Sequence, residues 1–184
     1  MKMDTNPKNQ TIHLGNHTIE VKETKEGRII AKLSSGFSFG VLEVEKTEKG
    51  EVRLKEMELG SAYVTAEQLA LLLYHTNLAE NVLDSIEKVC KLMTKTANMV
   101  NLGSLNIVVT VDKNGGKTAR LNSGESFGVI EMEKTSKGIR VKEMELGSAI
   151  LTTEHFAAVL FFADLDDEVV VEINKVKEYY SNNN

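Results

Sequence analysis

Hydrophobic and polar residues follow the same order twice along this chain of 184 residues. In each half, segments that alternate apolar and polar residues come first, and a longer segment with apolar residues three and four positions apart comes last. Alternation is typical of a β-strand with one buried face, and the wider spacing is typical of an amphipathic helix. The pattern therefore predicts strands followed by a helical segment in each half.

Four strands are predicted in each half. Those of the first half are Thr18–Glu23, Arg28–Leu33, Ser38–Lys46 and a strand that begins at Val52. Those of the second half are Asn106–Val111, Lys117–Leu121, Ser126–Lys134 and a strand that begins at Ile139. Thr65 and Thr152, each with a glutamate two residues later, predict helix N-caps. The polar residues Asn77 and Asp164 predict a break in each helical segment.

The two halves share a repeated segment, because the sequences of Ser35–Ala62 and Ser123–Ala149 are nearly identical. With Glu51 skipped, six of the 27 aligned pairs differ, and four of these six are swaps between apolar residues. Such swaps keep apolar volume at core positions. The period of 88 residues exceeds that of solenoid repeats, and each half is near the minimal size for a core of its own.

We therefore predict an α+β fold in which two tandem ββββα repeats pair as an intramolecular pseudo-dimer. The predicted organisation is a disordered tail over residues 1–12, a first repeat over 13–100, a second repeat over 101–180 and a short disordered tail over 181–184.

Composition favours a globular protein that stays in the cytoplasm. The chain has no apolar run that could span a membrane, its start is polar, and it has one cysteine, Cys90. A single cysteine cannot form an internal disulfide, which agrees with a reducing compartment, and we expect Cys90 to be a small buried residue. The net charge of −5 argues against indiscriminate coating of nucleic acid but leaves room for a local basic face.

Enzyme motifs are absent from the sequence, and we expect no catalytic activity, cofactor or metal. His13 and His17 are four residues apart, but Gly15 between them argues against a helix, so solvated histidines are favoured over a metal site. Acidic residues recur on neighbouring predicted strands, where pairing with lysines across strands is favoured over acid–base chemistry. They are Glu43, Glu45, Glu56, Glu58, Glu131, Glu133, Glu143 and Glu145.

Basic residues recur at equivalent positions around two predicted hairpins. Lys46 and Lys49 flank one hairpin, and Lys134 and Lys137 flank the other. Each hairpin leads into an Arg-x-Lys strand, which contributes Arg53 and Lys55 or Arg140 and Lys142. Two such hairpins would hold a phosphate backbone at two points. The alternative is that these are solvated edge lysines that prevent aggregation.

Phe39 and Phe127 begin the third predicted strands, each beside a glycine. An exposed ring at these positions would stack on a base, as in many single-strand binders. Burial of the rings as core anchors is an equally good interpretation.

The entry to each helical segment carries a family resemblance. Gly60–Leu69 and Gly147–Phe156 share a glycine, alternating apolar residues, a Ser or Thr, a Glu and a large apolar residue, and Ala163–Val169 is an acidic helix continuation. Together with the ββββα order, these segments resemble the Whirly-like single-stranded nucleic-acid-binding group, which includes positive transcriptional coactivators and purine-rich-element binding repeats. The resemblance implies that two units pair through their helices and that curved sheets present basic and aromatic side chains to single-stranded DNA.

Matched to this sequence, the resemblance implies a binding site made by the hairpin and strand residues named above, with Lys32 and Arg120 as additions. We expect a non-enzymatic accessory protein of phage or bacterial replication, recombination or transcription that binds single-stranded DNA or RNA. The alternative is a protein-binding module, or an inhibitor of a nucleic-acid enzyme, that acts through its acidic strands. The sequence leaves further homo-oligomerisation open.

Overall fold

The computed structural model describes residues 9–14, 17–35, 42–55, 61–95, 99–102, 105–123, 130–136, 138–142 and 148–183. The strands of the first half are β1 (Gln10–Leu14), β2 (His17–Glu23), β3 (Ile29–Ser35), β4 (Leu42–Lys46), β5 (Val52–Lys55) and β6 (Ser61–Val64). The strands of the second half are β7 (Met99–Leu102), β8 (Leu105–Val111), β9 (Lys117–Ser123), β10 (Ile130–Thr135), β11 (Gly138–Lys142) and β12 (Ser148–Leu151). The helices are α1 (Ala66–His75), α2 (Ala79–Leu92), α3 (Thr153–Phe162) and α4 (Asp166–Asn182).

The strands form two antiparallel six-stranded sheets that exchange a strand. The first sheet has the order β1-β2-β3-β4-β5-β12, and the second has the order β7-β8-β9-β10-β11-β6. The last strand of each half therefore lies in the sheet of the other half. The two exchanged pairings have equivalent registers, because Ser148 lies opposite Lys55 and Ser61 lies opposite Lys142.

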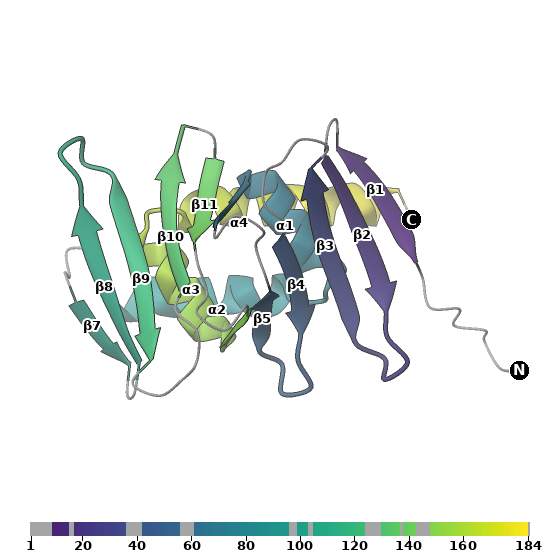
Figure 1. The fold of residues 1–184 in the computed structure, drawn as a ribbon, viewed down its shortest axis with the longest axis horizontal. Coiled ribbons are helices and arrows are strands. Elements are labelled where there is room, and N and C mark those ends of the chain that lie inside the picture. Colours follow the sequence, from purple (N-terminus) through teal and green to yellow (C-terminus); the bar gives the residue numbers. More distant parts are fainter. Residues whose placement is uncertain are drawn as a thin grey trace, which may run out of the picture.

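The helices are exchanged in the same way. Helix α1 packs on β3 and α3 packs on β9, so the first helix of each half covers its own sheet. The second helices cross over, because α2 packs chiefly against α3 and α4 packs chiefly against α1. Figure 1 shows the two sheets side by side along the long axis of the molecule, with the helices lying across both.

The hydrophobic core lies between the sheets and the helices. Alternate strand residues face it, among them Ile19, Leu33 and Val44 in the first sheet and Ile107 and Met132 in the second. The core surfaces of α1 and α3 differ, because Leu69 of α1 stands where α3 has Phe156, and Leu71 stands where α3 has Ala158. Full burial of such a side chain stabilises the fold by about 1.5–3 kcal/mol relative to exposure. Neither half keeps this core covered without the crossed-over helix of the other.

Local sequence determines where the helices begin and break. The Thr65 hydroxyl accepts a hydrogen bond from the Gln68 amide, and the Gln68 side chain accepts one from the Thr65 amide, which completes a capping box. Thr152 caps α3 in the same position. The predicted breaks are also confirmed, since Asn77 and Asp164 have φ of 61° and 58°. Each follows a helix C-terminus in a Schellman motif that turns the chain into the next helix.

The structure differs from the sequence-based organisation in three places. Each half has six strands rather than four, because the hairpin strands β1 and β7 add to each sheet and β6 and β12 are separate exchanged strands. The predicted tails are too long: β1 begins at Gln10, where Ile12 pairs with Ile19 beside the core, and α4 continues to Asn182. Cys90 is exposed on α2 rather than buried.

An ion-pair cluster holds the end of α2 to the α3–α4 turn. Lys95 Nζ lies 2.8 Å from Asp166 and 3.1 Å from Asp164, and Lys117 Nζ lies 3.6 Å from Asp164. Partial burial by itself would raise the pKa of Asp164, but hydrogen bonding and charge from Lys95, joined by Lys117, lower it below its usual value. Because the carboxylate is favoured in the folded state, these contacts stabilise the protein while Asp164 is ionised.

Substitution of Gly138 tests whether the exchanged strand β6 packs against β11. The φ of Gly138 is +124°, and a Cβ there would lie 2.7 Å from the Val64 carbonyl oxygen, whereas the equivalent Gly50, with φ of +80°, has nothing within 4 Å. We expect Gly138→Ala to lower the free energy of unfolding by at least about 2 kcal/mol, since backbone strain and a clash add together. Gly50→Ala carries the strain alone and should cost about 1 kcal/mol. Urea unfolding of both variants checks this, and equal costs would contradict the exchanged pairing.

Lys95→Met should change the acid sensitivity of the protein. The stability from the Asp164 ion pairs is present above the unfolded pKa of about 4 and is lost as the pH falls through the lowered folded value. We therefore expect the wild-type protein to lose more stability than Lys95→Met as the pH falls from about 5 to about 2. Thermal melts across this range measure the difference. Lys113→Met, in the exposed β8–β9 turn, is the control, and parallel curves for wild type and Lys95→Met would exclude the effect.

Candidate nucleic-acid interface

The outward faces of the two sheets carry basic residues at equivalent positions. Strand alternation turns Lys32 and Arg53 away from the core in the first sheet, and Arg120 and Arg140 occupy the matching positions in the second. The side chains of Arg53 and Arg140 are 31% and 29% exposed. Both sheets therefore present a similar set of cations on the side away from the helices.

Glutamates lie beside these cations in the cross-strand register. Lys32 stands opposite both Glu20 and Glu43, and Arg120 stands opposite Glu131. Arg53 and Arg140 stand opposite Glu45 and Glu133. Opposite charges on neighbouring strands stabilise a sheet by roughly 0.2–1 kcal/mol a pair. The outward faces are therefore ladders of alternating charge rather than uniformly basic surfaces.

Glu45 is the most enclosed of these acidic residues. Its side chain is 4% exposed, and it accepts a 2.6 Å hydrogen bond from Arg28 and lies 3.7 Å from Arg53. In the second sheet Glu133 accepts from Arg140 at 3.1 Å and from the Thr118 hydroxyl at 2.9 Å. The Nε atoms of Arg53 and Arg140 have no hydrogen-bond partner among the described residues. Glu45 thus pairs with two arginines, Arg28 and Arg53, and Glu133 pairs with one, Arg140.

Two of the predicted site lysines point toward the helices instead. Lys46 and Lys134 share the inward parity of their strands, at the strand ends. The Lys46 ammonium donates to the Asn77 carbonyl at 3.4 Å, and the Lys134 ammonium pairs with Glu168. These lysines connect the hairpins to the helix layer and do not lie on the face of Arg53 and Arg140.

The remaining predicted residues have mixed placements. Lys49 is exposed at the tip of the β4–β5 hairpin, as predicted for a hairpin cation. Lys55 and Lys142 lie in β5 and β11 opposite Glu43 and Glu131, but their side chains are outside the description. Lys137, Phe39 and Phe127 lie outside the described residues.

Sequence reasoning missed three residues of the outward faces. Arg28, the residue before β3, donates a hydrogen bond to Glu45, and its equivalent in the second half is Gly116. Tyr63 on β6 lies opposite Arg140, and Ile150 on β12 lies opposite Arg53. The alternation of Tyr63 with Val64 was a usable signal, because it places an aromatic residue outward, but the exchange that brings it beside Arg140 has no local signature.

A hollow of about 430 Å³ lies on the outward face of the second sheet. Its lining is Val108, Thr110, Thr118, Arg120 and Glu131. The matching positions of the first sheet hold two further charged residues, Glu20 and Lys22, where the second has Val108 and Thr110. The second sheet therefore combines a largely uncharged floor with the oppositely charged Arg120 and Glu131 at the wall.

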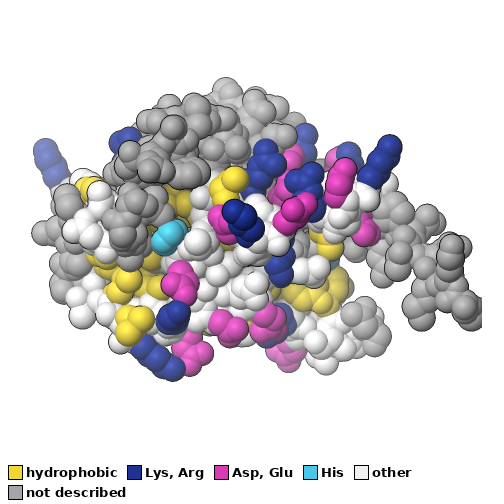
Figure 2. Space-filling view, turned by 90° about the horizontal axis from the view of Figure 1, so that it is seen from below, with side chains coloured by type: hydrophobic (Ala, Val, Ile, Leu, Met, Phe, Trp, Pro, Cys, Tyr) yellow, Lys and Arg dark blue, Asp and Glu magenta, His cyan; other side chains and the backbone are white. Residues whose placement is uncertain are grey.

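Charge is divided unevenly between the sheets and the helices. The four helices carry ten acidic and four basic residues. Figure 2 shows basic and acidic side chains interspersed on the face that it displays, without a continuous basic groove. The excess of acidic residues on the four helices is thus large enough to account for the net charge of −5 of the whole chain. On the outward faces of the sheets, the described acidic and basic residues nearly balance.

The described part of the chain contains no group of three or more His, Cys, Asp or Glu residues that could hold a metal ion. None of its helices is long and apolar enough to cross a membrane.

Comparison of this chain with protein-family models, with curated proteins and with solved structures found no match.

Removal of Glu45 should cost more stability than removal of its equivalent. Glu45→Ala removes the buried carboxylate that accepts a hydrogen bond from Arg28 and forms an ion pair with Arg53, and we expect a loss of about 2 kcal/mol. Glu133→Ala should cost less than about 1 kcal/mol, because Glu133 is 27% exposed and water can replace it. Guanidinium chloride unfolding measures both values. A larger cost for Glu133→Ala would contradict the role given to Arg28.

Proposed function

We propose that this protein binds single-stranded nucleic acid without catalysis, through the outward faces of its two sheets. The observation that carries the proposal is the hollow over β8 and β9, where Arg120 stands beside a floor of Val108, Thr110 and Thr118, with Glu131 on the neighbouring strand. A phosphate contacts an arginine through charge-assisted hydrogen bonds, and a sugar or base packs on apolar surface.

The duplication supports binding at two points. Lys32 and Arg120 occupy matching positions in β3 and β9, and Arg53 and Arg140 occupy matching positions in β5 and β11. A flexible strand that contacts one sheet has a raised effective concentration at the other, which increases affinity without new kinds of contact.

The separation of charge removes an objection to this function. A chain with a net charge of −5 repels a polyanion on average. The excess acidic residues lie on the helices, so a strand approaching the sheet face meets alternating charges rather than a negative surface. At the short distance of a direct contact, the attraction between a phosphate and an arginine of the sheet outweighs the repulsion from the acidic residues of the helices, because salt screens charges that are farther away.

In finer terms, we propose that each half descends from a Whirly-like ββββα unit and that the chain is an intramolecular pseudo-dimer of two such units. The equivalent sheet orders and the crossed helices are compatible with this origin, with β1 and β7 as additional edge strands. The proposed setting is a cytoplasmic accessory role in phage or bacterial replication, recombination or transcription.

The acidic strands are a weaker alternative basis for function. Glu45 is buried, and Glu133 is bonded to Arg140 and Thr118. Glu43 and Glu131 are partly exposed but lie opposite Lys32 and Arg120, so they present no continuous acidic surface. Glu56, Glu58, Glu143 and Glu145 lie outside the described residues.

A salt titration with paired variants tests the proposal. We expect labelled single-stranded DNA or RNA to bind with an affinity that falls as salt rises, measured by fluorescence anisotropy. Lys32→Gln and Arg120→Gln together should flatten the slope of log affinity against log salt by about 0.7 for each phosphate that is no longer neutralised, or about 1.4 in total. Both side chains are exposed, so their replacement should leave the fold intact.

Lys91→Gln is the control, because Lys91 is an exposed cation on α2, on the helix side. It should leave the slope unchanged. The absence of salt-sensitive binding near physiological salt, or equal slopes for the double variant and the wild type, would refute the proposed function.

A further inference from the structure

The helix layer contains two equivalent grooves that have diverged. One lies between α2 and α3 and is lined by Lys88, Val89, Leu92, Met93, Glu154, His155 and Ala158. The other lies between α4, α1 and β1, and has a volume of about 600 Å³ against about 240 Å³ for the first. We refer to the second as the tyrosine groove. Its lining is Ile12, His13, Glu67, Leu71, Glu172, Lys175, Val176, Tyr179 and Tyr180.

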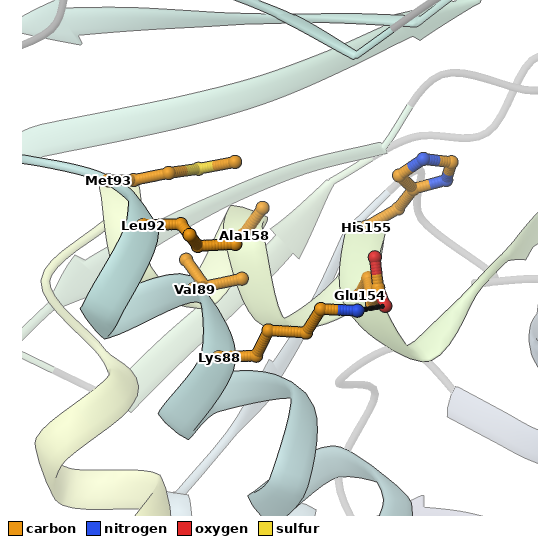
Figure 3. A pocket seen from close by; sticks show the side chains of 7 residues that line it. All are labelled: Lys88, Val89, Leu92, Met93, Glu154, His155 and Ala158. Atoms are coloured by element: carbon orange, nitrogen blue, oxygen red, sulfur yellow. Dashed lines mark hydrogen bonds and ion pairs between the residues drawn. The ribbon is translucent and has the colours of Figure 1, made fainter.

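The sequence repeat makes the α2–α3 groove an internal control. Leu92 and Met93 correspond to Tyr179 and Tyr180, so an aliphatic wall in one groove is aromatic in the other. Figure 3 shows the α2–α3 groove, where Lys88 reaches across to Glu154 with an Nζ–Oε1 distance of 2.6 Å. There the carboxylate at the groove edge is neutralised.

In the tyrosine groove the equivalent carboxylate has no such partner. Glu67 corresponds to Glu154 and Lys175 corresponds to Lys88, but Lys175 pairs with Glu172 on its own helix at 3.2 Å. No described residue forms an ion pair or hydrogen bond with the Glu67 carboxylate. The charged side chains that line the groove are therefore two carboxylates and one ammonium, and the excess charge is negative.

The tyrosine side chains form a fixed aromatic corner. The Tyr179 and Tyr180 rings are perpendicular, with centroids 5.1 Å apart, and Tyr180 stacks on Tyr74 at 4.8 Å. The Tyr180 hydroxyl lies 3.1 Å from His75 Nε2. Burial lowers the pKa of His75, and the tautomer of the ring determines which of the two groups donates this hydrogen bond. Tyr179 remains 61% exposed and presents its ring to solvent.

We propose that the tyrosine groove binds a cationic side chain, arginine or lysine, carried by a basic segment of a protein partner. A cation over a tyrosine face gains about 0.5–2 kcal/mol from the ring quadrupole, and Glu67 supplies an opposite charge at the same groove. The apolar residues Ile12, Leu71 and Val176 give the stem of the side chain a surface to pack on.

The open form of the groove favours a peptide over a free ligand. Tyr179 and Lys175 are well exposed, so a small cation bound there would keep much of its hydration and gain little. A side chain held by a peptide backbone brings additional contacts along α4 and β1. The acidic surface of the helices attracts such a basic segment, while the sheet faces stay available for the proposed nucleic-acid contact.

Tyrosine fluorescence of the full chain provides a direct test. The chain has four tyrosines and no tryptophan, and three of the tyrosines, Tyr74, Tyr179 and Tyr180, form this cluster. The probe is a glycine–arginine repeat peptide at low salt, and the reference is the glycine–citrulline peptide, which keeps the shape and removes the charge. We expect saturable binding of the arginine peptide with a change in tyrosine emission, and at least a tenfold weaker effect with citrulline.

Two variants localise the binding to the groove. Glu67→Gln and Tyr179→Leu, which introduces the residue of the other groove, should each weaken binding about five- to tenfold. Glu154→Gln is the matched control, because it removes the same first-turn charge from α3 and should leave binding unchanged. Circular dichroism melts verify folding, and if Glu67→Gln is destabilised, Tyr179→Leu still decides the question because its side chain is exposed.

Three results would overturn the proposal. One is binding of the citrulline peptide as tight as that of the arginine peptide, and another is equal affinity in the wild type and both groove variants. The third is binding of tetramethylammonium as tightly as the peptide, which would assign the groove to a free organic cation instead of a protein segment.

Discussion

Reciprocal exchange between the two halves is the constraint on which the rest of the structure depends. Strands β6 and β12 complete the opposite sheets, and helices α2 and α4 cover the opposite first helices. A half of this size is near the minimum for a core of its own, and the exchange gives each half additional apolar cover. The two halves are thus joined by a shared hydrophobic core rather than by a surface interface. Movement of one sheet relative to the other would require strands to unpair.

The sequence predicted the local structure better than the pairing. Alternation and the caps at Thr65 and Thr152 have short-range causes, and the break at Asn77 follows from the tolerance of Asn for positive φ. The strand exchange has no such cause. The equivalent positions 55 and 142 are both lysine, and the equivalent positions 61 and 148 are both serine. Pairing within a half and pairing between halves would therefore bring together identical residue types. Only the three-dimensional path of the chain distinguishes them.

The candidate site shows a similar division. Arg53 and Arg140 point outward, as the alternation predicted. The same alternation places Lys46 and Lys134 on the inward side of their strands, with Leu42 and Ile130. The prediction had grouped these lysines with the arginines because all four lie near the hairpins. The Arg28–Glu45 contact joins residues 17 positions apart and has no equivalent in the second half. Periodicity therefore located the faces, while the partners of each charge depended on tertiary contacts that no pattern encodes.

Because the unit is duplicated, equivalent positions of the two halves can hold different side chains and form two different surfaces. The first half ends α1 with Tyr74 and His75, which are partly buried, and the second ends α3 with Phe161 and Phe162, which are buried. The partly buried pair contacts Tyr180 beside the tyrosine groove, so hydroxyl and imidazole groups lie there on one side of the molecule. Because the exchanged helices hold both grooves in place, side chains at their edges can change chemistry without changing the fold, which is the condition under which a repeated unit acquires two specificities.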